Sequence, residues 1–179
     1  MSRKRWDAIL DRLQADRPIR GVEIGVLNGN TSHRILAARP LMTHIMIDPW
    51  EVPAEGSSYA MSNDTNSQKS QDAHNGAYEK TMACTAFAGD RAVIIRDYAE
   101  NVVDKYPDGS FDYIFIDGDH SYDGVKKDIA MWTCKVKKGG WIGGHDYDHP
   151  KLPGVKPAVD EAFPDGVELD DNRTWFKRL

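Results

Sequence analysis

Short apolar runs alternate along this chain with segments in which apolar residues recur every three or four positions. The short runs predict buried strands over residues 21–25, 43–48, 92–95, 111–116 and 141–144. The helical spacing predicts helices over residues 6–13, 32–38, 77–87, 100–106, 125–132 and 155–163. The last helix is followed by a predicted hairpin of residues 167–169 and 174–177.

The regular alternation of strand and helix favours one architecture. Parallel strands are joined by helical crossovers, and these helices cover both faces of the sheet. The pattern therefore predicts an α/β fold of three layers: a Rossmann-like, doubly wound, mostly parallel sheet with an antiparallel C-terminal edge hairpin. We interpret residues 1–179 as a single domain, and the long polar stretch 51–76 as a mobile lid inserted into it.

Composition narrows the class of protein further. Of the 179 residues, 40% are hydrophobic and 28% are charged, as in ordinary globular domains. The formal net charge of -5 argues against a nucleic-acid partner, and no apolar stretch approaches the roughly 18 residues of a membrane span. The N-terminus lacks the apolar core of a signal peptide, which predicts a cytoplasmic location.

Cys84 and Cys134 are expected to be reduced thiols, and the basic cluster of Arg3, Lys4 and Arg5 predicts a solvated helix start.

Acidic and imidazole side chains gather where two predicted strands end. Asp117 and His120 follow one apolar run, and His145 and Asp146 follow the next. In open α/β sheets, ligands bind at the carboxyl ends of the strands. The sequence therefore predicts a binding site at this edge.

The first predicted strand leads into a glycine turn, Gly25-Val26-Leu27-Asn28-Gly29. Its Gly-x-x-x-Gly spacing differs from the Gly-x-Gly-x-x-Gly of dinucleotide-binding proteins, and no P-loop lysine follows. The backbone N–H groups of such a turn can approach a ligand closely. Glu23, inside the strand, favours a cationic ligand group such as an amine. The alternative is a tight turn beside a solvated glutamate.

Other residues suggest that a nucleoside binds nearby. Asp48 follows Gly25 by 23 residues, close to the roughly 20-residue spacing at which an acid reaches a ribose. Trp50 offers a flat ring to a base, or else fills a turn as a buried side chain. Asp97 and Tyr98, after the third strand, are placed to contact an adenine edge, with a helix N-cap as the alternative.

The order of these segments resembles the class I S-adenosylmethionine-dependent methyltransferases over nearly the whole chain. Ile116-Asp117-Gly118-Asp119-His120-Ser121-Tyr122-Asp123-Gly124-Val125 and Gly143-Gly144-His145-Asp146-Tyr147 are most similar to a small bacterial subgroup related to macrocin-type sugar O-methyltransferases and to catechol-type, metal-dependent enzymes. The resemblance implies S-adenosylmethionine as cofactor. It implies that Glu23, Gly25 and Gly29 hold the methionine part, Asp48 the ribose and Asp97 the adenine. The predicted cofactor-binding set is completed by Asn28, Trp50, Tyr98 and Asp117.

The same resemblance implies a divalent metal. Catechol-type relatives place one carboxylate ligand after the fourth strand and two adjacent ligands after the fifth, which here correspond to Asp117, His145 and Asp146. His145 stands where sugar-modifying relatives often carry an aspartate. An all-oxygen set suits Mg²⁺, whereas a histidine ligand is better tolerated by Mn²⁺, Fe²⁺ or Zn²⁺.

His120 stands where catechol-type enzymes carry a general-base lysine. We therefore predict two catalytic residues: His120, as the general base, and Asp117. An imidazole titrates near neutral pH and can accept a hydroxyl proton. Its alternative role is that of a hydrogen-bond donor at a helix start. The other histidines are predicted to be structural or exposed: His33, His44, His74 and His149.

We therefore predict an enzyme that transfers a methyl group from S-adenosylmethionine to an oxygen of a small-molecule acceptor such as a sugar. Acceptor recognition is expected from the first helix, the lid and the loop 147–154, or from a partner subunit in a homodimer. Two alternatives stay open. One is a metal-dependent oxidoreductase, because antibiotic-hydroxylase proteins share a similar Asp-Gly-Asp-His-Ser-Tyr segment, and the other is a non-catalytic S-adenosylmethionine-binding module.

Overall fold

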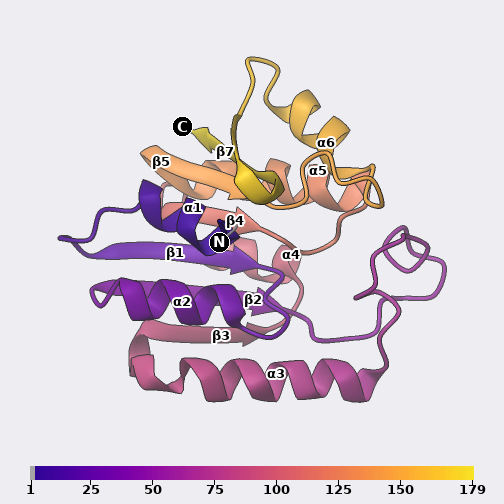
Figure 1. The fold of residues 1–179 in the computed structure, drawn as a ribbon, viewed down its shortest axis with the longest axis horizontal. Coiled ribbons are helices and arrows are strands. Elements are labelled where there is room, and N and C mark those ends of the chain that lie inside the picture. The colour runs from indigo at the N-terminus through magenta and orange to yellow at the C-terminus, as the bar shows by residue number, and fades with distance from the viewer. Residues whose placement is uncertain (1–2) are drawn as a thin grey trace.

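A seven-stranded sheet forms the middle layer of the protein, as seen in a computed structural model that describes residues 3–179 (Figure 1). Its strands are β1 (Ile19–Ile24), β2 (Met42–Asp48), β3 (Ala92–Arg96), β4 (Phe111–Ile116), β5 (Val136–Gly144), β6 (Glu168–Asp170) and β7 (Thr174–Arg178). The order across the sheet is β3-β2-β1-β4-β5-β7-β6. Among these described strands, β7 runs antiparallel to both of its neighbours, β5 and β6, and the remaining pairs are parallel. The predicted fold class, with its antiparallel C-terminal edge, is confirmed.

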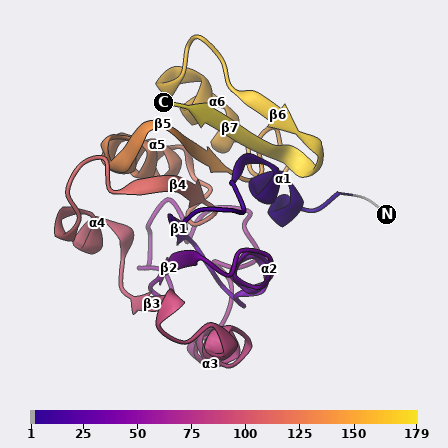
Figure 2. The same cartoon turned by 90° about the vertical axis from the view of Figure 1, so that its left-hand side faces the viewer.

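Helices cover both faces of the sheet, which Figure 2 shows nearly end-on. One face carries α1 (Arg5–Arg12), α2 (Asn30–Ala38) and α3 (Gln71–Thr85); the other carries α4 (Ala99–Val102), α5 (Tyr122–Trp132) and α6 (Val155–Ala162). Short 3₁₀ turns are η1 (Ala86–Arg91), η2 (Val103–Lys105), η3 (Thr133–Lys135) and η4 (Asp171–Arg173). Within the described residues, no helix is both long and apolar enough to cross a membrane.

The central strand β4 explains why the strands appear as unbroken apolar runs. Ile114 and Ile116 pack in the cluster beneath α5 and α6, whereas Tyr113 and Phe115 pack beneath α1. Successive side chains of a strand point to opposite faces. Because helices cover both faces, every position of β4 is buried, and apolar and polar residues do not alternate along it. Its one charged residue, Asp112, is also buried and forms ion pairs with Arg17 and Lys137.

Two elements begin five or more residues before their predicted start. Helix α3 begins at Gln71 rather than at residue 77, with the Ser70 hydroxyl accepting a hydrogen bond from the N–H of Ala73 at 3.3 Å. Its first turn is polar, so hydrophobic spacing did not reveal it. Strand β5 begins at Val136 rather than at residue 141. The register of β5 shifts against β4 here, an irregularity that suits glycine.

The segment 51–70 contains no helix or strand and lies beyond the carboxyl ends of the parallel strands (Figure 1). The last part of the predicted lid therefore belongs to α3. The remaining part forms a chain of turns over the edge where the predicted site residues collect. Its mobility stays a prediction.

Candidate active site

Two cavities open at the carboxyl edge of the sheet. The β4/β5 cavity, about 550 Å³, is lined by Asp117, His120 and Asp146 beside the glycine turn. The β2/β3 cavity, about 350 Å³, is lined by Asp48 and Tyr98. Both cavities are lined by Gly25, Leu27, Asn66 and Asp117. The two cavities therefore lie next to each other at the glycine turn and share part of their lining.

The glycine turn is held tightly against the end of β4. Gly25 has a φ of +82°, and a Cβ atom there would lie 2.2 Å from the backbone oxygen of Asp117, so no other residue fits without a shift. The Asp48 carboxylate accepts hydrogen bonds from the N–H groups of Val26 and Leu27, each at 2.9 Å. Burial raises the pKa of Asp48 despite these bonds. Asp48 thus fixes the turn as well as lining the β2/β3 cavity.

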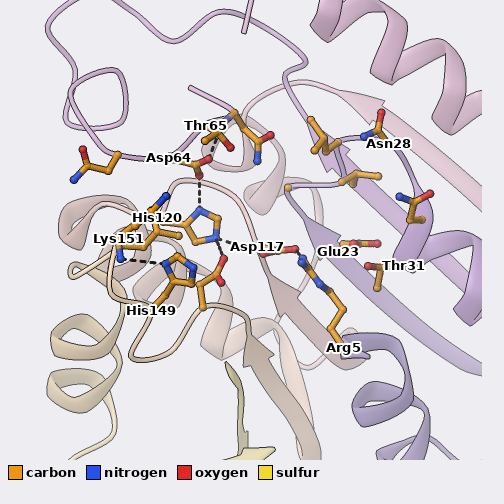
Figure 3. Close-up of a pocket in the computed structure, with 18 of the residues that line it drawn as sticks. Arg5, Glu23, Asn28, Thr31, Asp64, Thr65, Asp117, His120, His149 and Lys151 are labelled. Carbon is orange, nitrogen blue, oxygen red and sulfur yellow. Dashed lines mark hydrogen bonds and ion pairs between the residues drawn. The ribbon is translucent and has the colours of Figure 1, made fainter. Parts of the chain in front are cut away.

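Asp117 and His120 lie together in the β4/β5 cavity (Figure 3), and Asp146 converges with them there. Nε2 of His120 lies 3.4 Å from Oδ1 of Asp117 and 3.3 Å from Oδ2 of Asp146. One potential ligand atom from each residue lies within 4.8 Å of the other two. The ends of β4 and β5 thus bring two carboxylates and an imidazole together, as the sequence predicts, with a spacing that suits one bound cation.

His145 lies beside this cluster rather than within its tightest part. Its Nδ1 atom is 3.1 Å from Oδ2 of Asp146 and 3.7 Å from Oδ1 of Asp117. This nitrogen is buried and has no partner with hydrogen-bond geometry in the described part of the chain. Burial lowers the pKa of His145, which favours the neutral ring. A neutral ring can offer Nδ1 to a cation, but the prediction that His145 is a ligand stays a prediction.

Asp146 combines strong electrostatic stabilisation with an unusual backbone. Burial alone would raise its pKa, but His145, His120 and Arg5 lower it to about 2. Its φ is +60°, a left-handed conformation that asparagine and aspartate tolerate better than most residues. The carboxylate is therefore ionised across the physiological range and held in one place.

Glu23 lies on the floor of the β4/β5 cavity and is 2% exposed. Its Oε2 atom accepts a hydrogen bond from Ser32 and lies 3.3 Å from Nε2 of His44. Nδ1 of His44 in turn lies 2.9 Å from the hydroxyl of Tyr113. Since both contacts use Oε2, Oε1 is left for a ligand. His44 is structural, as predicted.

Arg5 is a site residue that the sequence interpretation missed. Its guanidinium forms an ion pair with Oδ2 of Asp117 (Figure 3), so the prediction that this cluster is merely solvated is wrong for Arg5. Nothing local signals the contact, because Arg5 and Asp117 meet only when α1 packs across the sheet. The pair leaves Oδ1 of Asp117 directed at His120 and His145.

Asp64 is a second residue that sequence reasoning missed. It lies in the segment 51–70, is 5% exposed, and has its Oδ2 atom 2.7 Å from Nδ1 of His120. Burial would raise the pKa of Asp64, but hydrogen bonds with His120 and the N–H of Asn66 lower it. One acid among many polar residues carries no pattern that could have revealed this contact.

Some predicted cofactor contacts differ in the structure. Trp50 is fully buried, and its indole N–H donates to the backbone oxygen of Leu27 at 2.8 Å. The prediction that its ring lies beside a base is therefore wrong. Gly29 caps α2 and packs against α3 rather than lining a cavity. Asp97 precedes Tyr98, the N-cap of α4, and accepts hydrogen bonds from the N–H of Tyr98 and the side chain of Asn101. It therefore supports the start of α4 without capping it.

The three regions expected to recognise an acceptor all line the β4/β5 cavity. Arg5 and Trp6 come from α1, residues 63–66 from the segment over the edge, and residues 149–152 from the loop after β5. His149 is among them, and His74 lines the β2/β3 cavity. Both cysteines are free thiols, as expected.

Asp128 on α5 is a buried carboxyl group that lines the β2/β3 cavity and is 8% exposed. Burial, together with Asp119 and Glu100, raises its pKa to about 7. Between about pH 4, where an unfolded aspartate ionises, and pH 7, only the unfolded chain loses this proton, so stability falls as pH rises.

We expect Asp128→Asn to raise the free energy of unfolding by on the order of 2 kcal/mol at pH 8 and by little at pH 4. Urea unfolding at both pH values measures the difference, with Asp16→Asn, an exposed acid, as the control. An equal gain at the two pH values would contradict the raised pKa.

Comparison with known proteins identifies the family. A family model described as "Methyltransferase domain" matches residues 22–147, which include the glycine turn and all of the acids and imidazoles of the β4/β5 cluster. An uncharacterized protein of Acanthamoeba polyphaga mimivirus is 28% identical over 145 residues, which are 80% of this chain and 59% of that protein. The chain thus spans about three fifths of this curated relative.

Solved structures share the fold. The TDP-rhamnose 3'-O-methyltransferase CalS11 of calicheamicin biosynthesis has a TM-score of 0.66 at 19% identity, over 97% of this chain and 76% of its own. The O-methyltransferase NovP has a TM-score of 0.71 at 17% identity, over 97% of this chain and 78% of its own. At such identities the likeness concerns the fold. Together with the matching family model, which covers most of the sheet and most of the residues that line the two cavities, it shows that this chain belongs to the class I S-adenosylmethionine-dependent methyltransferases.

Proposed function

We propose that this protein methylates an oxygen of a small-molecule acceptor in the β4/β5 cavity, with the help of a divalent cation. The observation that carries the proposal is the convergence of Asp117, His120 and Asp146 within 4.8 Å of one another, beside the turn that would hold the cofactor. Methyl transfer is an in-line displacement, so the protein must align the acceptor oxygen with the methyl group and take up one proton.

The shared wall of the two cavities supports an arrangement for S-adenosylmethionine. The adenosyl part would lie in the β2/β3 cavity near Asp48 and Tyr98, and the methionine part would cross Gly25 into the β4/β5 cavity. There the amino group would meet Glu23, whose Oε1 atom is free of the Ser32 and His44 contacts. The methyl group would then point toward the Asp117 end of the cavity.

The residues fit a divalent cation by the chemistry of their donors. Oδ1 of Asp117 and the Asp146 carboxylate are hard oxygen donors, and the unpartnered Nδ1 of His145 is a third candidate donor. Such a set suits Mg²⁺ or, with the imidazole included, Mn²⁺. When bound, the cation would lower the pKa of an acceptor hydroxyl.

The side chains around the cation would then divide the work. The carboxylates of Asp117 and Asp146 would hold the cation. Arg5 forms an ion pair with Oδ2 of Asp117, which leaves Oδ1 for the cation. We assign proton uptake to Nε2 of His120, because it faces the point where the two carboxylates converge.

The acceptor class follows from the need for an ionisable hydroxyl next to these groups. A sugar hydroxyl fits this requirement, and the solved structure CalS11 carries the name of a TDP-rhamnose methyltransferase. The direct test is transfer of radiolabelled methyl from S-adenosylmethionine to a panel of sugars, nucleotide sugars and catechols, with Mg²⁺ or with excess chelator. Methylation of nitrogen acceptors alone would contradict the proposal, and full activity in chelator would remove the cation from it.

Cofactor binding makes a separate prediction. S-adenosylhomocysteine should raise the melting temperature, because a ligand that binds only the native state stabilises it, whereas NAD should not. Asp48→Ala should weaken S-adenosylhomocysteine binding by at least about tenfold, a loss of about 1.4 kcal/mol, since it removes a ribose partner and the support of the glycine turn. Calorimetry measures both ligands, and Asp16→Ala serves as an exposed control. Binding of NAD without S-adenosylhomocysteine would contradict the assignment.

A further inference from the structure

The contact between Asp64 and His120 joins two segments that are far apart in the sequence. Asp64 belongs to the segment 51–70, and His120 belongs to the connection between β4 and α5. Both side chains are buried, at 5% and 7% exposure, and Oδ2 of Asp64 lies 2.7 Å from Nδ1 of His120 (Figure 3). A buried carboxylate at this distance forms a strong hydrogen bond with an imidazole N–H.

Asp64 is fixed by its own segment. Its Oδ1 atom accepts a hydrogen bond from the N–H of Asn66 at 2.8 Å. Its backbone oxygen accepts the hydroxyl of Ser67 at 2.8 Å, and its N–H donates to the hydroxyl of Ser62 at 3.2 Å. The turn therefore presents Oδ2 to His120 in one orientation, and the carboxylate does not depend on the histidine to hold it.

The arrangement decides which nitrogen of His120 carries the proton. A neutral imidazole has one donor and one acceptor nitrogen. An ionised carboxylate can only accept a hydrogen bond, so the ring nitrogen that faces Asp64 at 2.7 Å, Nδ1, is the donor. Nε2 is then left with a lone pair, as a base or a ligand requires.

We propose that Asp64 is a positioning residue that holds the proton of His120 on Nδ1 and keeps Nε2 unprotonated toward Asp117 and Asp146. The proposal deepens the proposed function and rests on it for its catalytic meaning. Its structural content is independent of any acceptor. The segment 51–70 thus covers the site and also contributes Asp64, which positions His120. The site is complete only when this segment is in place.

The decisive experiment measures the tautomer of His120 by ¹⁵N nuclear magnetic resonance in the full-length protein, at a pH where its ring is neutral. His120→Gln assigns the signals. We expect a protonated Nδ1 and an unprotonated Nε2 in the unaltered protein. In Asp64→Ala the proton should move to Nε2. A protonated Nε2 in the unaltered protein, or the same tautomer in both proteins, would overturn the proposal.

Kinetics provides the second readout, using an acceptor found in the methyl-transfer assay. Asp64→Ala should lower kcat by about 10- to 100-fold, as expected when an outer partner of a functional histidine is removed. Asp64→Glu, which keeps the charge, should recover part of the loss, and S-adenosylhomocysteine affinity should stay unchanged. An unchanged kcat in Asp64→Ala would also contradict the proposal.

Glu55→Ala is the matched control, because Glu55 is another acid of the segment 51–70, is exposed and lines neither cavity. It should leave the tautomer and kcat unaltered. If no acceptor is methylated, the proposed function fails, while the tautomer measurement still decides the role of Asp64.

Discussion

Asp146→Asn should lower turnover by about 10² to 10³ and abolish its dependence on Mg²⁺ or Mn²⁺. Holding a cation at the reacting oxygen contributes several kcal/mol, and each 1.36 kcal/mol changes the rate about tenfold. Asparagine is chosen because the φ of +60° at this position would strain alanine. The affinity for S-adenosylhomocysteine should change little, since the carboxylate serves the acceptor side of the cavity.

Turnover across a metal titration and calorimetry with S-adenosylhomocysteine measure these two effects separately. Asp148→Asn is the matched control, because Asp148 lies in the same loop, also has a positive φ of 57° and is exposed. A variant at Asp146 that keeps both full turnover and metal dependence would remove this carboxylate from the site.

His120→Ala should lower the rate by roughly 10² to 10⁴, the usual contribution of a positioned general base. Cation binding should persist, because the oxygens of Asp117 and Asp146 remain. Turnover and Mn²⁺ affinity of the same variant are the two measurements. His149→Ala removes another imidazole from the cavity and should have a much smaller effect.

The two measurements together also separate the roles of His120. Loss of Mn²⁺ affinity along with turnover would make the imidazole a ligand instead of a base, which its position among the two carboxylates also permits. An unchanged rate would return His120 to a hydrogen-bonding role at the start of α5.

The central strands and the carboxyl-edge acids were predictable because their signals are local. Residues 113–116, directly before Asp117, are buried between two helical layers, so they form a contiguous apolar run, and the polar residue that ends this run marks the edge of the sheet. Asp146 follows β5 in the same way. Helix α3 shows the limit of this reasoning, since its start rests on the cap at Ser70 and not on hydrophobic spacing.

Trp50 shows a different limit. The sequence favours neither a ring against a base nor a ring in the core, because both roles need a large aromatic side chain after a strand. The packing of Trp50 against Tyr78 of α3, with ring centroids 4.9 Å apart, buries the ring and decides the question. Only the path of α3 across the sheet supplies that neighbour.

The sequence by itself determined the doubly wound fold, the glycine turn, and the acids that follow β4 and β5, because each depends on neighbours within one strand or turn. Only the tertiary structure decided that Arg5 pairs with Asp117 across 112 positions and that Asp64 meets His120 across 56. A single charged residue in a polar segment forms no periodic pattern from which its contacts could be predicted. Its role is set by which distant carboxylate or imidazole the folded chain brings within hydrogen-bond distance.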